Sequence, residues 1–244
     1  MDFFNVSMPY TTVQPETLDG LLADGWRILS KGFVRHSHAL ADESELPNDD
    51  NWCRTIPVRI RLSNFRLSKS QRQLMRRNSD LHVNIQPIQV DADKHLLFNK
   101  HYLQRFKKLN AIHVFLRADS ATSPCEGIEF NVWKDGRLIA YSTIHVGREG
   151  VSSTYAFYDP DESNRSLGVF TMLLEINYAQ QNGKSFYYPG YVYDKPSKMD
   201  YKRNFFGIEY YNWKNKWTSF QRGTTPELPP EVFPEISISD KSQQ

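Results

Sequence analysis

The sequence IEFNVWKDGRLIAYSTIHV, residues 128–146, decides the expected fold. Its two largely apolar halves, Ile128 to Lys134 and Arg137 to Val146, flank the dipeptide Asp135-Gly136. Asp-Gly between two apolar runs is among the strongest short signals for a β-hairpin with a two-residue turn. The stretch therefore predicts two adjacent antiparallel strands.

The chain after this hairpin extends the same layer. A third strand is expected over Val151 to Tyr158, and a helix over Leu167 to Gln181 that stops at Asn182-Gly183. Another strand is expected over Ser185 to Tyr193. An antiparallel meander followed by a helix and a strand predicts a mixed α/β layer.

The first half of the chain predicts alternating helices and strands. We expect helices over Pro15–Gly25, Ser68–Asn78 and Leu96–Leu109, and strands that include Ile56–Leu62 and His82–Val90. Apolar and basic residues alternate over Ile56–Leu62, as in a half-exposed strand. The core-facing stripe of the third helix is expected to be Leu96, Leu103, Phe106 and Leu109.

Two polar stretches and the overall composition limit the remaining possibilities. Residues 39–51 are acidic and predict an exposed loop, and the proline-containing stretch from about Thr224 predicts a loosely attached tail. Of the 244 residues, 39% are hydrophobic and 24% charged, with a net charge of +2, which favours a soluble, globular, cytoplasmic protein. We expect no targeting segment, no membrane span and no membrane partner.

Several kinds of site are not expected. The two cysteines, Cys53 and Cys125, are too few for a disulfide framework or a four-cysteine metal site, so we expect no metal. We find no phosphate-binding glycine loop and no Gly-x-Ser-x-Gly motif. His36 and His38 are interpreted as surface or loop residues.

The first candidate site is the basic stretch over residues 65–78, with five cations and no acid. On a helix, Lys69, Arg72 and Arg76 share one face, and Arg77 follows. A solvated charged helix is one interpretation, and a polyanion-binding face is the other, because a polyanion would relieve the repulsion between the cations.

The second candidate site lies where the strand ending at Tyr158 gives way to a helix. Asp159 follows the strand, and the helix begins at the end of the run Arg165-Ser166-Leu167-Gly168. Free N–H groups at a helix start can bind an anion or a developing oxyanion, and glycine lets a ligand approach closely. The alternative is an ordinary Asp-Pro turn followed by a cap.

The third candidate site combines tyrosines with cations. Four tyrosines surround Pro189-Gly190, among them Tyr191, and Tyr201 follows nearby. The cations Lys195, Lys198, Lys202 and Arg203 lie just beyond. This pattern predicts either a phenol-lined pocket for a charged substrate or a tyrosine-rich sheet with a solvated basic loop.

Taken together and in this order, the three stretches resemble one family. They are similar to the arginyl-tRNA–protein transferases and the related bacterial leucyl-tRNA transferases, which act on acidic N-termini. The resemblance covers most of residues 20–217 and is carried by these motifs: Gly25-Trp26-Arg27, Ser68-Lys69-Ser70-Gln71-Arg72, Arg76-Arg77-Asn78, Phe157-Tyr158-Asp159-Pro160, Ser166-Leu167-Gly168, Gly190-Tyr191 and Lys198-Met199-Asp200-Tyr201-Lys202.

The resemblance implies a GNAT-like α/β acyltransferase core preceded by a smaller domain. We expect an N-terminal domain over residues 1–94, the transferase domain over 95–222 and a flexible tail over 223–244. The implied reaction is attack of a protein α-amine on the aminoacyl ester of tRNA, with aminoacyl-tRNA as co-substrate, no cofactor and protein N-termini as partners. The implied donor is arginine or leucine.

The resemblance also implies roles for particular residues. Asp159 is expected to position or accept a proton, and the backbone near Leu167 and Gly168 to stabilise the oxyanion. The expected catalytic group is Tyr158, Asp159, Ser166, Leu167, Gly168 and Tyr191. The expected substrate-binding residues are Arg165, Lys198, Tyr201 and Lys202, and the expected tRNA-binding residues are Lys69, Arg72, Arg76 and Arg77.

The chain departs from the family pattern at three places. Family N-terminal domains carry cysteine pairs before the basic stretch, and here Cys53 is the sole cysteine in that part. Pro189 replaces the usual leucine, and Gln73 interrupts the basic run. Two alternatives stay open: a non-catalytic relative that binds tRNA or N-termini, and a GNAT-type acyltransferase with another acyl donor. The chain shows no basic, glycine-rich pyrophosphate loop at Arg165–Gly168, and this counts against the second alternative.

Overall fold

The computed structural model describes residues 4–9, 11–29, 32–40, 52–107 and 109–226. Four α-helices lie within these ranges: α1 (Pro15–Ala23), α2 (Lys69–Arg77), α3 (Ala92–Phe106) and α4 (Leu167–Gln181). Short 3-10 helices are η1 (Leu62–Asn64), η2 (Ile112–Val114), η3 (Pro160–Arg165) and η4 (Asp200–Asn204). The strands are β1 (Asn5–Pro9), β2 (Arg27–Leu29), β3 (Gly32–His36), β4 (His38–Leu40), β5 (Trp52–Arg61), β6 (His82–Pro87), β7 (Gly127–Lys134), β8 (Arg137–Val146), β9 (Gly150–Tyr158), β10 (Phe186–Tyr193), β11 (Ile208–Tyr211) and β12 (Trp217–Ser219).

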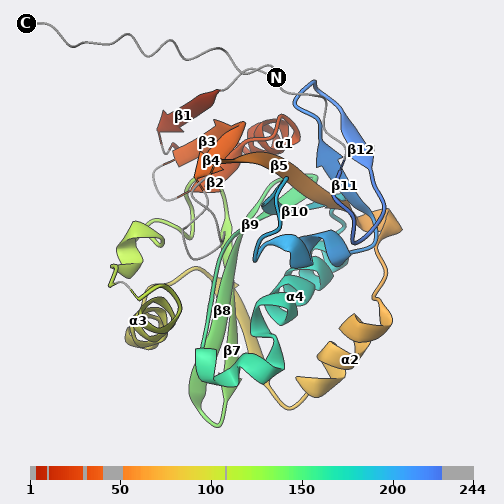
Figure 1. Ribbon diagram of the computed structural model, residues 1–244. Coiled ribbons are helices and arrows are strands. Elements are labelled where there is room, and N and C mark those ends of the chain that lie inside the picture. The colour runs from red at the N-terminus through yellow and green to blue at the C-terminus, as the bar shows by residue number, and fades with distance from the viewer. Residues whose placement is uncertain (1–3, 10, 30–31, 41–51, 108, 227–244) are drawn as a thin grey trace, which may run out of the picture.

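A large sheet forms the centre of the molecule (Figure 1). Its strand order is β12-β11-β5-β10-β9-β8-β7-β6, and β4 pairs with β5 outside this path. The expected β7–β8 hairpin is confirmed, with Asp135 at φ 50° and Gly136 at φ 76°, the left-handed conformations that a type I′ turn requires. The α/β fold class is therefore confirmed.

Helices cover both faces of the large sheet (Figure 1). Residues of β8 reach both cores: Ile139 packs in the core on the α4 side, whereas Leu138 and Tyr141 pack in the core on the α3 side. The α4 side also contains Leu74 from α2. None of the helices in the described ranges combines the length and apolar character that crossing a bilayer requires.

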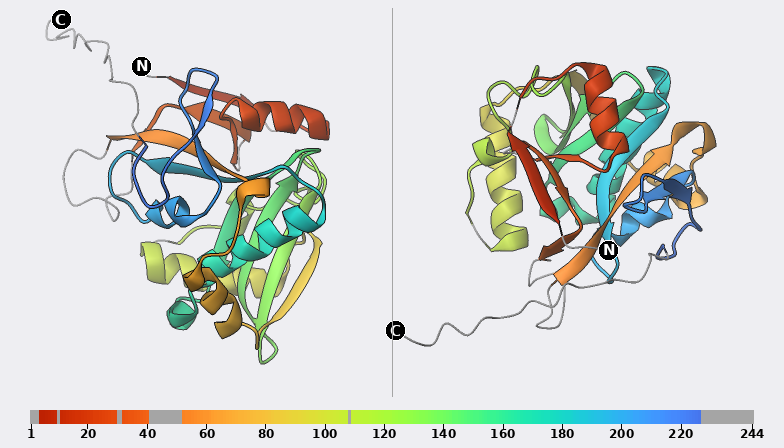
Figure 2. Two further views of the ribbon diagram at one scale, coloured as in Figure 1. Left: turned by 90° about the vertical axis from the view of Figure 1, so that its right-hand side faces the viewer. Right: turned by 90° about the horizontal axis from the view of Figure 1, so that it is seen from above.

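A smaller sheet lies at one end of the large one, with α1 beside it (Figure 2). Its strand order is β1-β3-β2. Leu18 and Leu22 of α1 pack with Ile28, Phe33 and Tyr188, so this layer shares a core with strand β10. The boundary expected at residue 94 does not separate two sheets, because β5 and β6 belong to the same sheet as β7–β10.

Two local predictions were wrong. Strand β5 is buried rather than half-exposed: Arg59 is buried because it pairs with Glu209 of the neighbouring strand β11. Helix α3 turns another face to the core than the one expected, since Leu96 is 69% exposed and Leu103 is 51% exposed. Its buried residues are Lys94, Leu97, Phe98 and His101.

The two polar stretches are only partly described. Ala39 and Leu40 belong to β4 rather than to the expected loop, and residues 41–51 lie outside the described ranges. Of the expected tail, residues 223–226 are described, and Arg203 donates a hydrogen bond of 2.6 Å to the Thr225 hydroxyl. Residues 227–244 lie outside the described ranges.

The feature that positions the site is the short pairing of β9 with β10. These two strands run parallel, and they pair only from Phe186 to Tyr188 against Gly150 to Ser152. After Tyr188 the Pro189-Gly190 irregularity follows, and beyond it β10 pairs only with β5, which lies along its other edge. The second half of β9 therefore has a free edge facing away from β8.

Candidate active site

A buried carboxyl group lies on the α4 side of these two strands. Glu175 is 0% exposed, and its Oε2 accepts a 2.6 Å hydrogen bond from the hydroxyl of Tyr187 on β10. Its other oxygen has no hydrogen-bond partner among the described residues. Burial raises the pKa of Glu175 to about 7, although the nearby hydroxyls of Ser142, Tyr187 and Ser153 partly offset this shift. This carboxyl can therefore exchange a proton near neutral pH.

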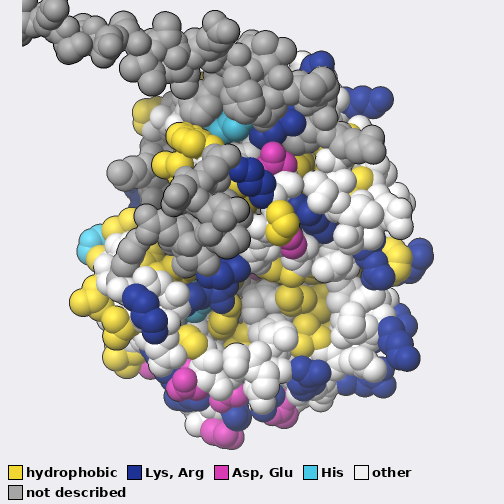
Figure 3. Space-filling model, viewed as in Figure 1, with side chains coloured by type: hydrophobic (Ala, Val, Ile, Leu, Met, Phe, Trp, Pro, Cys, Tyr) yellow, Lys and Arg dark blue, Asp and Glu magenta, His cyan; other side chains and the backbone are white. Residues whose placement is uncertain are grey.

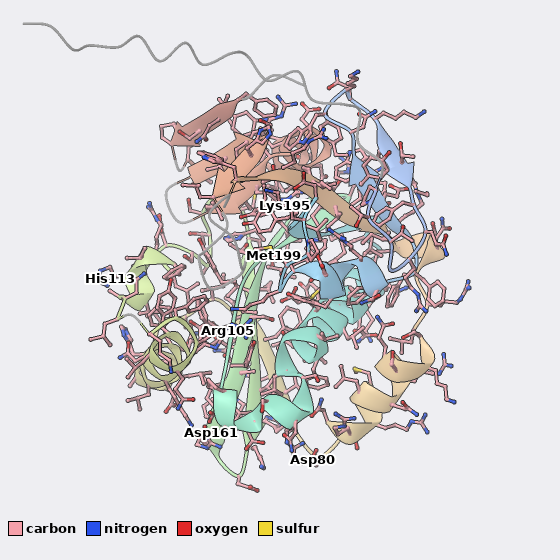
Figure 4. All side chains as sticks on the ribbon, viewed as in Figure 1. Asp80, Arg105, His113, Asp161, Lys195 and Met199 are labelled. Carbon is pink, nitrogen blue, oxygen red and sulfur yellow. The ribbon has the colours of Figure 1, made fainter. Side chains whose placement is uncertain are left out.

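Two further tyrosines belong to the same group. Tyr201 is 38% exposed, and desolvation of its hydroxyl, followed by the proximity of Tyr158 and Glu175, raises its pKa to about 12. Tyr158 ends strand β9, and its hydroxyl accepts a hydrogen bond from Arg105 of α3. Figure 4 labels Arg105 in the space between α3 and α4. Three phenols and one carboxyl thus come together from α4, β9, β10 and η4.

His101 closes part of the free edge of β9. Its Nδ1 lies 2.8 Å from the carbonyl oxygen of Tyr158, and its ring packs edge-on against the ring of Tyr158 with centroids 4.7 Å apart. Burial lowers the pKa of His101 below its ordinary value, so the ring is neutral at pH 7. This contact holds Tyr158 in place at the end of the strand.

The start of α4 lies beside Tyr158. Ser166 precedes it in the left-handed conformation, with φ 49° and ψ 48°. The backbone N–H groups of Leu167 and Gly168 have no acceptor among the described residues, as is usual in the first turn of a helix. A Cβ atom on Gly168 would lie 3.3 Å from the Tyr158 ring, so glycine allows this close approach.

Asp159 has a different environment from the one expected of a proton acceptor. It is 0% exposed, Lys100 contacts its Oδ1 at 2.7 Å, Arg137 pairs with its Oδ2, and the Asp161 backbone N–H donates to Oδ1. Burial raises the pKa of Asp159, but the hydrogen bonds from Lys100, Asp161 and Arg137 bring it below the ordinary value. Of the two expected roles, these contacts favour positioning over proton acceptance.

Arg165 is also committed to other groups. It contacts Asp80 at 2.9 Å and Glu162 at 3.1 Å, so its charge is already paired and does not suit acceptor binding. Lys202 lies nearer the tyrosines: its Nζ donates to the Tyr191 carbonyl at 3.2 Å. Lys198 is exposed in the loop after β10, where Figure 4 labels Lys195 and Met199.

The basic helix α2 has the predicted cap and an exposed cationic face. Ser68 and Gln71 form a capping box at its start. The cations Lys69, Arg72, Arg76 and Arg77 are exposed, and within the described ranges none of them forms an ion pair. Arg77 donates a 2.7 Å hydrogen bond to the carbonyl of Asn164, which joins α2 to the segment before α4. Lys and Arg side chains lie over this edge of the molecule in Figure 3.

Sequence reasoning placed Tyr158, Tyr201 and the helix start in one site, and the structure brings these together with Lys202 and Tyr191 near the end of β10. It missed Glu175. The available signal was that Glu175 is the single charged residue in the otherwise uncharged α4 sequence LGVFTMLLEINYAQQ. A lone acid on a helix that packs against a sheet is either paired or functional.

Asp159→Asn is expected to destabilise the fold by about 2–3 kcal/mol, because it weakens the hydrogen bonds of a buried carboxylate to two cations. The lowered pKa adds a pH dependence: the stabilisation is complete above the unfolded-state carboxyl pKa of about 4 and is lost as pH falls through the lower folded-state value. Urea unfolding at pH 7 and pH 3 measures both effects.

The exposed acid Asp161 provides the control, since Asp161→Asn keeps the Asp159 contacts. A pH-rate profile of Asp159→Asn that loses its inflection, with unchanged stability, would contradict the structural role and restore the proton-accepting one.

Known proteins resemble this chain in sequence. The family described as "Arginine-tRNA-protein transferase, C terminus" matches residues 91–212, which is half of the chain. The aspartate/glutamate leucyltransferase of Saccharophagus degradans is 30% identical over 173 residues, covering 68% of this chain and 71% of that protein. The protein of the same name from Acinetobacter baumannii (strain AYE) is 29% identical over 180 residues, covering 70% of this chain and 65% of that protein, so this chain spans less than two thirds of its length.

Solved structures resemble it more weakly. FemX superimposes with a TM-score of 0.44 and 10% identity, covering 80% of this chain and 65% of FemX. The C-terminal domain of a putative lysylphosphatidylglycerol synthetase from Agrobacterium fabrum gives a TM-score of 0.45 and 15% identity, covering 57% of this chain and 46% of that one.

Proposed function

Since this chain belongs to the arginine-tRNA-protein transferase family, we propose that it transfers an amino acid from aminoacyl-tRNA to the N-terminal α-amine of a protein. The observation that carries the proposal is Glu175, a buried carboxyl with a pKa of about 7 among three tyrosines. Glu175, Tyr158, Tyr187 and Tyr201 all lie within the matched residues 91–212.

The substrates follow from the names of the relatives. We propose leucine as the donated residue and acidic N-termini as acceptors, because the curated relatives are called aspartate/glutamate leucyltransferases. Arginine is the other donor, since the family description names it. Aminoacyl-tRNA and protein N-termini are then the partners, no cofactor is required, and the cytoplasm, where aminoacyl-tRNA is made, is the proposed location.

In the proposed reaction the free α-amine attacks the ester carbonyl. A C–N bond forms, the C–O bond to the tRNA ribose breaks, and the ribose oxygen takes up a proton as it leaves. The Glu175 carboxylate accepts the proton that the amine gives up, and the Tyr187 hydroxyl bonded to it fixes its orientation. The N–H groups of Leu167 and Gly168 face the developing oxyanion.

The proposal is tested by single-turnover transfer. Purified protein is mixed with tRNA charged with labelled leucine or arginine and with a peptide that begins with aspartate. Labelled peptide supports the proposal. Binding of tRNA without any transfer would identify a non-catalytic relative, and transfer from an acyl-CoA in place of tRNA would identify another acyl donor.

The exposed face of α2 is proposed to contact tRNA phosphates. The double replacement Arg72→Ala and Arg76→Ala is expected to weaken tRNA binding about tenfold or more at moderate salt, because two phosphate contacts are lost. The slope of log K against log salt should flatten by about 1.5. Filter binding over a salt series measures both quantities.

A control pair uses Arg117→Ala with Arg148→Ala, two exposed cations outside α2. If the α2 pair and the control pair bind charged tRNA equally well, α2 is only a solvated face.

A further inference from the structure

Strand β2 contains a buried arginine that has no counter-ion within the described ranges. Arg27 is 5% exposed, and its Nη1 donates a 2.6 Å hydrogen bond to the carbonyl of Trp26. Its Nε and Nη2 are buried and have no hydrogen-bond partner among the described residues. Burial lowers the pKa of Arg27 to about 10, so the guanidinium stays charged at pH 7.

Among the described residues no acidic side chain pairs with Arg27. Its guanidinium carbon lies 5.8 Å from the ring centroid of Tyr188, and Tyr191 is also nearby. The Nε2 of His36 is buried and has no hydrogen-bond partner in the described part of the chain, and burial, followed by the charge of Arg27, lowers the pKa of His36. His36 was expected at the surface; it lies in β3 with its ring against Tyr191 at 5.4 Å.

A second buried arginine shows what a structural guanidinium looks like in this fold. Arg59 on β5 pairs with Glu209 at 2.6 Å and lies over the rings of Phe186 and Trp217 at 4.0 and 4.4 Å. A buried charge without such a partner lowers the stability of the fold. Arg27 therefore resembles a group that binds an anionic ligand more than a structural arginine such as Arg59.

The open atoms of Arg27 define the kind of anion. Nε–H and the neighbouring Nη2–H lie on one edge of the planar guanidinium and point the same way, which matches the two oxygens of a carboxylate. The bond from Nη1 to Trp26 fixes the orientation of this edge. Phenol rings and a neutral imidazole nearby suit a single carboxylate better than a doubly charged phosphate.

The position of Arg27 relates it to Glu175. Tyr187 and Tyr188 are consecutive residues of β10, and their side chains point to opposite faces of the sheet: Tyr187 toward Glu175 and Tyr188 toward Arg27. Tyr188 is also the last residue of β10 that pairs with β9, and β2 lies against β9. The open edge of Arg27 and the carboxyl of Glu175 thus lie on opposite sides of the place where β9 and β10 separate.

We propose that Arg27 binds the side-chain carboxylate of the acceptor's first residue and thereby selects acidic N-termini. The inference rests on the proposed transferase function and assigns its acceptor pocket. In this proposal the peptide N-terminus enters from the β2 side of the place where β9 and β10 separate, with its carboxylate at Arg27 and its α-amine directed through that gap to the α4 side. Arg203, one of the cations that follow the tyrosine-rich stretch, is bonded to the Tyr193 carbonyl and to Thr225.

The test compares Arg27→Gln and Arg27→Lys with the wild-type full-length chain. Peptides that differ only in a first residue of Asp or Asn are used with the same charged tRNA, and kcat/KM is measured. For Arg27→Gln, kcat/KM for the Asp peptide is expected to fall about 100-fold, while that for the Asn peptide changes less than about twofold. Arg27→Lys should lie between, because it keeps the charge and loses the paired donors.

Arg148→Gln, at an exposed arginine of the β8–β9 turn, is the control with the same substitution. It is expected to keep the Asp-over-Asn preference. A preference retained in Arg27→Gln, or lost equally in Arg148→Gln, would overturn the assignment. A weaker affinity of Arg27→Gln for tRNA with an unchanged preference would also overturn it, and would assign Arg27 to a tRNA phosphate.

A binding measurement without tRNA separates this inference from the proposed function. An Asp-initiated peptide should raise the melting temperature of the wild type and leave that of Arg27→Gln unchanged. Without peptide, Arg27→Gln should melt no lower than the wild type, because it removes an unpaired buried charge. If the wild type binds the Asp peptide but transfers nothing to it, the function proposal fails and the Arg27 assignment stands; if the peptide stabilises both proteins equally, the Arg27 assignment fails.

Discussion

Replacing Glu175 by glutamine is expected to lower the single-turnover rate of transfer by about 100- to 10,000-fold, the usual contribution of a general base. Glutamine has nearly the same shape and can still accept the Tyr187 hydrogen bond, so the fold should persist. The wild-type rate should rise with pH through an inflection near the carboxyl pKa of about 7. The variant should lose that inflection and keep only the one of the acceptor amine, near 8.

The same residue gives an independent pH effect on stability. A carboxyl whose pKa is raised in the folded state binds more protons there than in the unfolded state, so stability falls as pH rises from about 4.5 to about 7 and then levels off. The loss amounts to roughly 3 kcal/mol. Glu175→Gln should remove this slope, whereas the control Glu149→Gln, on the exposed β8–β9 turn, should keep it and the rate. A Glu175→Gln protein that transfers at the wild-type rate would exclude Glu175 as the proton acceptor.

Glu209→Ala is expected to destabilise the fold by about 3–5 kcal/mol, because it leaves Arg59 buried without its partner. Glu209 also pairs with Arg61 at 2.8 Å, but Arg61 is 41% exposed. The control Arg61→Ala should therefore cost less than about 1 kcal/mol. Chemical unfolding of both variants measures the difference.

The joint replacement Arg59→Met with Glu209→Leu removes both charges and should recover most of the loss. If Glu209→Ala and Arg61→Ala lower the free energy of unfolding equally, the buried Arg59–Glu209 pair contributes no more to stability than the partly exposed Arg61–Glu209 pair. Because β5 pairs with β10 as well as with β11, this ion pair also holds the strand that carries Tyr187 and Tyr188.

The parts of the fold that the sequence predicted well have local causes. The Asp135-Gly136 turn, the start of α2 at Ser68 and the span of α4 depend on residues a few positions apart, and all three are confirmed. The failures depend on distant partners. Arg59 was interpreted as an exposed residue of an alternating strand, because its partner Glu209 is 150 positions away and the neighbouring sequence gives no sign of it.

The candidate site divides in the same way. The tyrosines beside the Pro-Gly break pointed to the region where Tyr158, Tyr191, Tyr201 and Lys202 come together, since unusual composition is visible without a fold. Glu175 and Arg27 were missed in their roles because their significance is burial without a full set of partners, a property of the packed molecule. Asp159 was given a chemical role for the opposite reason, as its cations Lys100 and Arg137 come from α3 and β8.

The unpaired edge of Arg27 also bears on how many residues one acceptor receives. In the proposed reaction the product begins with leucine or arginine, which has no carboxylate for that edge, and the original acidic side chain now lies one residue farther along, by about 3.5 Å. A modified protein is then a poorer acceptor than a fresh one. On the proposed assignment of Arg27, addition stops after a single residue, and the group that selects the first substrate also sets the length of the extension.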